Sequence, residues 1–135
     1  MIENVSPTEA WNQLKKDKEA VMVDVRTPEE WSLVGEPDLS SIGHILRKIS
    51  WQNLQGQRNA HFIDDLKKLA LDKNQPIYFL CRSGVRSLSA AQAAIQAGFT
   101  KVYNVKGGFE GGQNHENHRG YVEGWKAEHL PWVQP

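Results

Sequence analysis

Short apolar segments that alternate with helical ones are the feature of this sequence that most constrains its fold. The runs at residues 21–25, 77–80 and 101–105 are rich in β-branched and aromatic residues and are too short for independent helices. The first two are apolar at successive positions, as in strands covered by helices on both faces. Because parallel neighbours in a sheet need a crossover, which a helix supplies, the sequence predicts an α/β fold. Its central, mostly parallel sheet is expected to have helices on both faces.

Two capping boxes mark where helices begin. Ser6 and Thr27 are each followed by proline and, three residues after the cap, by Glu9 and Glu30. In this pattern the cap hydroxyl and the glutamate satisfy free N–H groups of the first turn. The first helix is expected to run to about residue 16, and the second to end between residues 31 and 33.

Two further helices and one further strand follow from spacing and composition. Apolar residues in segment 60–71 recur at helical intervals. The alanine-rich segment 87–97 also predicts a helix, which Gly98 would end. Residues 35–41 are rich in Gly, Pro, Asp and Ser, so we expect a surface loop there, leading to a short strand at 42–45.

Size and charge narrow the choice of partners. A chain of 135 residues suits one domain, here residues 1–135 with a core at about 6–132. Because 16 Lys and Arg balance 16 Asp and Glu, neither nucleic acid nor a membrane surface is an expected partner. The amino terminus lacks the pattern of a secretory signal, and the single cysteine cannot form an intramolecular disulfide. Both observations favour a cytoplasmic location.

That cysteine, Cys81, occupies a position suited to chemistry. It follows a predicted buried strand and precedes a helix, and open α/β sheets bind ligands at the carboxyl ends of their strands. A short loop closed by a helix N-terminus can turn successive N–H groups inward around an anion. Arg82 and Arg86 would add positive potential and favour the thiolate, and Gly84 permits a tight turn. An inert buried thiol is the alternative.

The loop 81–86, Cys-Arg-Ser-Gly-Val-Arg, resembles the active-site loop of rhodanese-like sulfurtransferases. Further landmarks of that family occur in the same order along residues 6–132: Asp24-Val25-Arg26 followed by segment 27–31, Gly43-His44-Ile45, and Gly107-Gly108 with Trp125. Segment 46–51 departs from the small, proline-containing stretch usual in the family, and segment 35–41 is longer than usual.

The resemblance implies sulfur transfer by double displacement. Cys81 would take a sulfur atom from a donor such as thiosulfate and pass it to cyanide, a low-molecular-weight thiol or a protein acceptor. No metal or organic cofactor is required. The residues implied to cradle the persulfide and the departing anion are Arg82, Ser83, Gly84, Val85, Arg86 and Ser87.

Three other functions are alternatives to an enzymatic sulfurtransferase: a cysteine-dependent phosphatase, a non-catalytic binding module and a persulfide carrier. Cysteine-dependent phosphatases place their arginine six positions after the cysteine, whereas Arg86 is five positions on, and Leu80 stands where they usually have histidine. A non-catalytic binding module would commonly lose the cysteine. A carrier that hands persulfide to a partner would have the same sequence features as an enzyme.

The remaining polar candidates are more typical of structure than of chemistry. Asp24 and Arg26 are predicted to form an ion pair at a strand end, and His44 to fix a loop. His115 and His118 could suggest a metal site, but glycines surround them and predict a solvated loop. The tail after residue 107 is expected to wrap back through its aromatic residues.

Overall fold

The computed structural model describes residues 2–69 and 72–135. Its centre is a five-stranded parallel sheet with the order β1-β6-β5-β2-β4, which confirms the predicted α/β class. The strands are β1 (Ile2–Val5), β2 (Val21–Asp24), β4 (Arg47–Lys48), β5 (Ile77–Leu80) and β6 (Val102–Val105).

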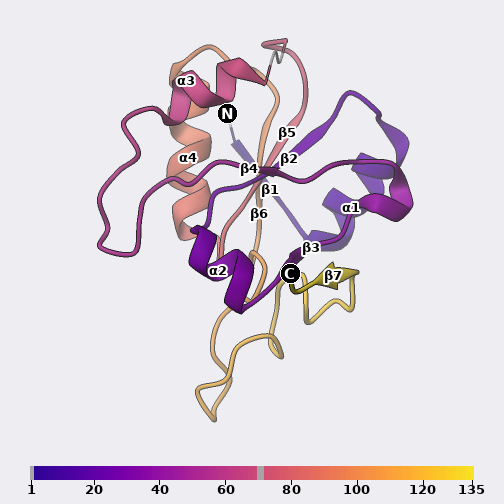
Figure 1. Ribbon diagram of the computed structural model, residues 1–135. Helices are drawn as coiled ribbons and strands as arrows, with labels where there is room; N and C mark the ends of the chain where they lie inside the picture. The colour runs from indigo at the N-terminus through magenta and orange to yellow at the C-terminus, as the bar shows by residue number, and fades with distance from the viewer. Residues whose placement is uncertain (1, 70–71) are drawn as a thin grey trace.

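Helices cover both faces of the sheet (Figure 1). On one face lie α3 (Phe62–Lys68) and α4 (Val85–Gln96), which share a core with β2 and β5 around Phe79. On the other face α1 (Pro7–Lys16) packs with the carboxyl-terminal tail around Trp125. All four residues of β5 are buried, which explains why that strand is apolar at every position.

The two capping boxes form as predicted. Ser6 Oγ accepts from the Glu9 N–H at the start of α1, and Thr27 Oγ1 accepts from the Glu30 N–H at the start of α2 (Pro28–Leu33). Because each box satisfies two free N–H groups by local contacts, sequence spacing was enough to locate both helix starts.

Other boundaries differ from expectation. The strand predicted at 42–45 is wrong: residues Ser40–Ile42 form a 3₁₀ turn, and β4 lies at Arg47–Lys48. The turn forms because Asp38 Oδ1 accepts from the Ser40 N–H and Gly43 leaves it with φ 75°. Within the predicted loop 35–41, residues Glu36–Pro37 form β3, which pairs with β7 (Trp132–Val133).

The ends of two helices also differ from the predicted bounds. Helix α3 is shorter than the predicted 60–71, and the part of that prediction at 70–71 lies outside the described residues. Helix α4 begins at Val85, two residues before the predicted start, because Gly84 caps it with φ 107°. The edge strand β1 was not predicted, since only pairing with β6 makes its residues a strand.

The tail wraps back onto the sheet, as predicted. Trp125 is fully buried, its Nε1–H donates to the Pro131 carbonyl at 2.7 Å, and its ring meets Trp11 edge-on. The tail thereby lies across the edge of the sheet where the strands end (Figure 1). In the part of the chain described here, no helix has the length and apolar character needed to span a bilayer.

Candidate active site

Cys81 lies in the turn between β5 and α4, at the carboxyl edge of the sheet. Its side chain is almost completely buried, and its Sγ accepts a hydrogen bond from the Gly84 N–H at 3.1 Å. Helix α4, which begins directly after Gly84, spans 12 residues, so its free N–H groups and dipole favour negative charge on this side. The turn therefore provides a sheltered environment for an anionic sulfur.

A glycine-rich segment supports this turn from behind. The Phe109 N–H donates to the Cys81 carbonyl at 2.8 Å, and the Glu110 and Gly111 N–H groups donate to the Arg82 carbonyl at 2.9 and 3.0 Å. Gly108 permits the contact, because it has φ 60° and a Cβ there would lie 2.7 Å from the Arg82 oxygen. The segment thus satisfies the carbonyls of the turn and fixes its shape.

A pocket of about 480 Å³ opens over Cys81. Its wall is formed by the turn after β5, by Glu30 of α2 and by residues 52–54 in the loop that follows β4. The residues lining it are Glu30, Gln52, Asn53, Leu54, Cys81, Arg82, Ser83, Val85 and Arg86. Five residues predicted from the sequence are brought together here, while Gly84 and Ser87 contact the sulfur itself.

The charge of Arg86 is held by Glu30, a partner that sequence reasoning missed. The two side chains form a double hydrogen bond, with Nη1 to Oε1 at 2.7 Å and Nη2 to Oε2 at 2.8 Å. Burial alone would raise the pKa of Glu30, but the hydrogen bonds and charge of Arg86, together with the hydrogen bonds to Thr27, outweigh burial and leave that pKa below its usual value. The Glu30 bond likewise raises the pKa of Arg86 against the opposing effect of burial. Arg82, by contrast, is exposed.

Neutralising Glu30 should weaken the fold in a pH-dependent way. We expect Glu30→Gln to lower the free energy of unfolding by about 1 kcal/mol at pH 7, since glutamine keeps the capping pattern but loses the charge on a mostly buried pair. The folded-state pKa is lowered, so the stabilisation is present at neutral pH and is lost as the pH falls below about 4. Urea titrations of both proteins at several pH values measure the difference.

Glu29 provides the matched control, because it is the exposed neighbour in the same helix turn. Glu29→Gln should change stability by only a few tenths of a kcal/mol, from the helix dipole. An equal loss in both variants, or a difference for Glu30→Gln that does not shrink as the pH falls from 7 to 3, would show that the ion pair does not stabilise the fold.

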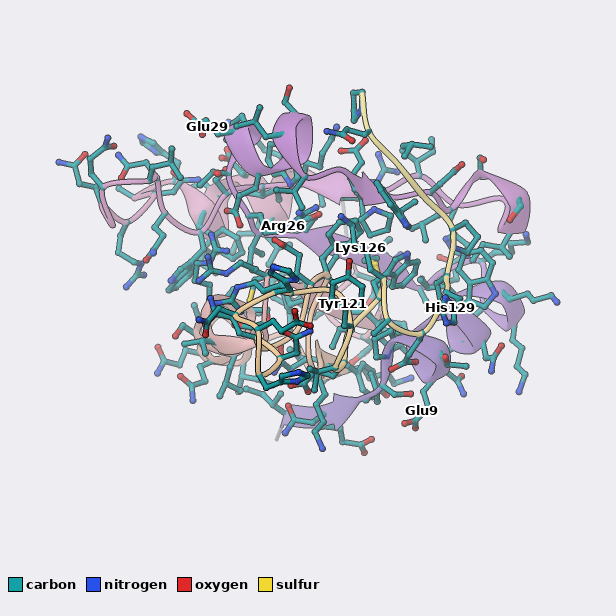
Figure 2. All side chains as sticks on the ribbon, turned by 90° about the horizontal axis from the view of Figure 1, so that it is seen from below. Glu9, Arg26, Glu29, Tyr121, Lys126 and His129 are labelled. Atoms are coloured by element: carbon teal, nitrogen blue, oxygen red, sulfur yellow. The ribbon has the colours of Figure 1, made fainter. Side chains whose placement is uncertain are left out.

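The polar residues assigned structural roles lie outside the pocket wall. Arg26 is fully buried, bonds Asp24 at 2.7 Å and the Gly35 carbonyl at 2.8 Å, and lies over the Phe109 ring. His44 contacts the Leu14 carbonyl of α1 through Nε2. Figure 2 views the carboxyl edge of the sheet and shows Arg26 between Glu29 of α2 and the tail residues Tyr121 and Lys126.

A chain of polar contacts extends from the sulfur through Ser87 of α4 to Asn104 of β6 and Asn4 of β1. Ser87 Oγ lies 3.3 Å from Cys81 Sγ and 2.5 Å from Asn104 Oδ1. Asn104 Nδ2 donates to the Gly84 carbonyl at 3.2 Å and to Asn4 Oδ1 at 3.0 Å. Asn104 was also missed, although a polar residue in the middle of the buried strand Val102–Val105 was a signal that could have identified it.

Residues 115–118 lie in an exposed turn of the tail. Among residues 2–69 and 72–135, no three His, Cys, Asp or Glu side chains converge in a way that could hold a metal ion.

Comparisons with known proteins agree with this geometry. Residues 6–115 match the rhodanese-like domain. The crystal structure of Rv0390 from M. tuberculosis superposes with a TM-score of 0.91 at 44% identity, covering 98% of each chain. The uncharacterized protein RC0915 of Rickettsia conorii is 38% identical over 97% of each chain. The thiosulfate sulfurtransferase GlpE of Glaesserella parasuis is 30% identical over 79% of this chain and 82% of its own. The match over residues 6–115, with Cys81 in the turn before α4, shows that this chain belongs to the rhodanese-like domain family.

Proposed function

We propose that this protein is a sulfurtransferase that carries sulfane sulfur as a persulfide on Cys81. The observation that carries the proposal is the placement of the single cysteine of the chain. Its sulfur lies under a pocket, accepts the Gly84 N–H, and faces the N-terminus of α4. Such a site favours a sulfur anion without a metal or organic cofactor.

The reaction proceeds by two displacements. The Cys81 thiolate attacks the outer sulfur of thiosulfate, the S–S bond of the donor breaks, and sulfite leaves with the electron pair. An acceptor such as cyanide then attacks the outer sulfur of the persulfide, forms thiocyanate, and returns Cys81 as the thiolate. Covalent catalysis thus divides one difficult transfer into two easier ones.

Residues of the turn and pocket have separate roles in this scheme. The Gly84 N–H stabilises charge on sulfur, and exposed Arg82 attracts the anionic donor to the mouth. Ser83 and Val85 shape the wall around the outer sulfur, and Ser87 contacts Sγ from α4. Arg86, paired with Glu30, fixes one side of the pocket.

Likeness to GlpE supports thiosulfate as the donor class, since that relative is described as a thiosulfate sulfurtransferase. The acceptor is a thiophile, either cyanide or a thiol on a small molecule or protein. We further propose that the chain acts as one domain, residues 1–135, in the cytoplasm, because a lone exchangeable thiol is best kept in a reducing compartment.

The pairing of Arg86 argues against phosphoryl transfer. A phosphatase cradle uses its arginine to hold the phosphoryl oxygens, but here both terminal nitrogens of Arg86 are bonded to the Glu30 carboxylate. The arginine is also one position too close to the cysteine.

Mass spectrometry after incubation with thiosulfate tests the proposal directly. We expect the mass of one added sulfur atom on the peptide that contains Cys81, removed by dithiothreitol or cyanide. Protein alkylated with iodoacetamide beforehand is the control and should gain no sulfur. If the untreated protein also remains unmodified with thiosulfate and with a polysulfide donor, the proposed function is wrong.

A further inference from the structure

The buried chain Cys81–Ser87–Asn104 determines where the hydroxyl proton of Ser87 points. Asn104 is 4% exposed and Ser87 is fully buried, so their polar atoms have to find partners within the protein. Each of these partners can be identified from the contacts. Together they determine whether Ser87, on α4, presents a proton or a lone pair to Cys81 Sγ.

The orientation of the Asn104 amide follows from a backbone carbonyl. One end of the amide lies 3.2 Å from the Gly84 oxygen, which can only accept. That end is therefore the Nδ2 donor, and it also donates to Asn4 Oδ1. The other end, Oδ1, faces Ser87, and turning the amide over would place two acceptors against each other.

The Ser87 hydroxyl can then donate its proton to only one of two neighbours, Asn104 Oδ1 or Cys81 Sγ. It carries a single proton, and Asn104 Oδ1, an acceptor, lies 2.5 Å away, whereas the sulfur is 3.3 Å away. The proton goes to Asn104, because the short O–H···O bond is the stronger of the two. Ser87 therefore presents a lone pair, and no proton, to Cys81 Sγ.

We propose that Asn104 is a positioning residue that holds the Ser87 proton away from Cys81. In this arrangement Sγ accepts from the Gly84 N–H and faces the lone pairs of Ser87 Oγ, which lies 3.3 Å away. That acceptor suits the thiol, whose S–H can donate to it, and it opposes the bare thiolate through lone-pair repulsion.

This arrangement has a consequence that rests on the proposed function. In the persulfide, Sγ is bonded to the outer sulfur and carries no proton or full charge, so the Ser87 lone pair does not oppose it. The pair Ser87–Asn104 therefore disfavours the thiolate that leaves when sulfur is given up, and lengthens the life of the loaded form. An empty thiolate remains a strong nucleophile toward the next donor.

The charged groups around Cys81 are the same in the parent protein and in the Ser87, Asn104 and Asn4 variants. They come from the turn, from α4, from α2, from the end of β2 and from the tail. These groups are Arg82, Arg86, Glu30, Asp24, Arg26 and Glu110. Substitutions at Ser87 and Asn104 alter none of these charges. A change in the pH midpoint of Cys81 alkylation therefore reflects the loss or reorientation of the Ser87 hydroxyl.

The test is the pH dependence of Cys81 alkylation by iodoacetamide, which needs no sulfur donor. Because the chain has one cysteine, the rate reports a single thiol. We expect Ser87→Ala to move the midpoint of the rate profile about half a pH unit toward acid, since it removes the opposing lone pair. If Ser87 instead donates to the sulfur, the midpoint will move toward alkaline pH and the proposal is overturned.

Asn104→Ala provides the second measurement. It frees the Ser87 proton to turn toward Sγ, so the midpoint should move by about one pH unit toward acid, a tenfold change in thiolate fraction at low pH. In a Ser87→Ala background the same change should give no further shift. An equal shift in both backgrounds, or a loss of melting temperature with no shift, would assign Asn104 a purely structural role.

Asn4→Ala is the matched control, because it removes the exposed end of the chain and leaves the Gly84 carbonyl to orient the amide. Its midpoint should equal that of the parent protein, and a shift as large as that of Asn104→Ala would contradict the proposal. Failure of sulfur loading alone would count against the proposed function and would leave this alkylation result unaffected.

Discussion

Cys81→Ser should fold normally and lose sulfur transfer from thiosulfate to cyanide by at least about a thousandfold. A serine hydroxyl at neutral pH does not supply an anion comparable with a thiolate, so no covalent intermediate forms. Folding should survive because the hydroxyl is close in size and can accept the Gly84 N–H that the sulfur accepts. Thiocyanate production measures the activity, and thermal melting measures the fold.

Ser89→Ala is a suitable companion, since Ser89 lies on the same helix but lines a different hollow with Trp51 and Arg58. It should retain full turnover. Substantial activity in Cys81→Ser would exclude the covalent mechanism, while a large drop in melting temperature would leave mass spectrometry of the parent protein as the deciding experiment.

Inserting one glycine between Val85 and Arg86 should reduce sulfur transfer about a hundredfold. A persulfide is compact, and its stabilisation requires N–H groups that converge on one sulfur atom. The insertion adds a residue at the first turn of α4, so it enlarges the cradle and moves Arg86 away from Glu30. Steady-state rates with thiosulfate and cyanide measure the effect.

A glycine inserted between Lys18 and Glu19 controls for the added residue, because that turn follows α1 and does not line the pocket. This control should keep its activity. The unmodified protein should hydrolyse aryl phosphates negligibly. Robust phosphatase activity that Cys81→Ser abolishes would overturn the assignment to sulfur chemistry.

Local interactions explain which parts of the fold could be predicted from the sequence. The starts of α1 and α2 depend on capping contacts between residues three apart, and β5 is recognisable because both of its faces are buried. The turn after β5 was predicted for the same reason, since the strand end, Gly84 and the helix N-terminus are consecutive in the chain.

Tertiary contacts decided the rest. The edge strand β1 depends on β6, about 100 residues away, and Arg86 is paired by a glutamate 56 residues earlier. Sequence patterns established that a thiol would stand between a buried strand and a helix. Only the tertiary structure decided which groups support that thiol: the N–H groups of residues 109–111, which donate to carbonyls of the turn, and Asn104, which contacts Ser87. The physical reason is that a buried polar group needs a hydrogen-bond partner, and the folded chain can bring that partner from a distant part of the sequence.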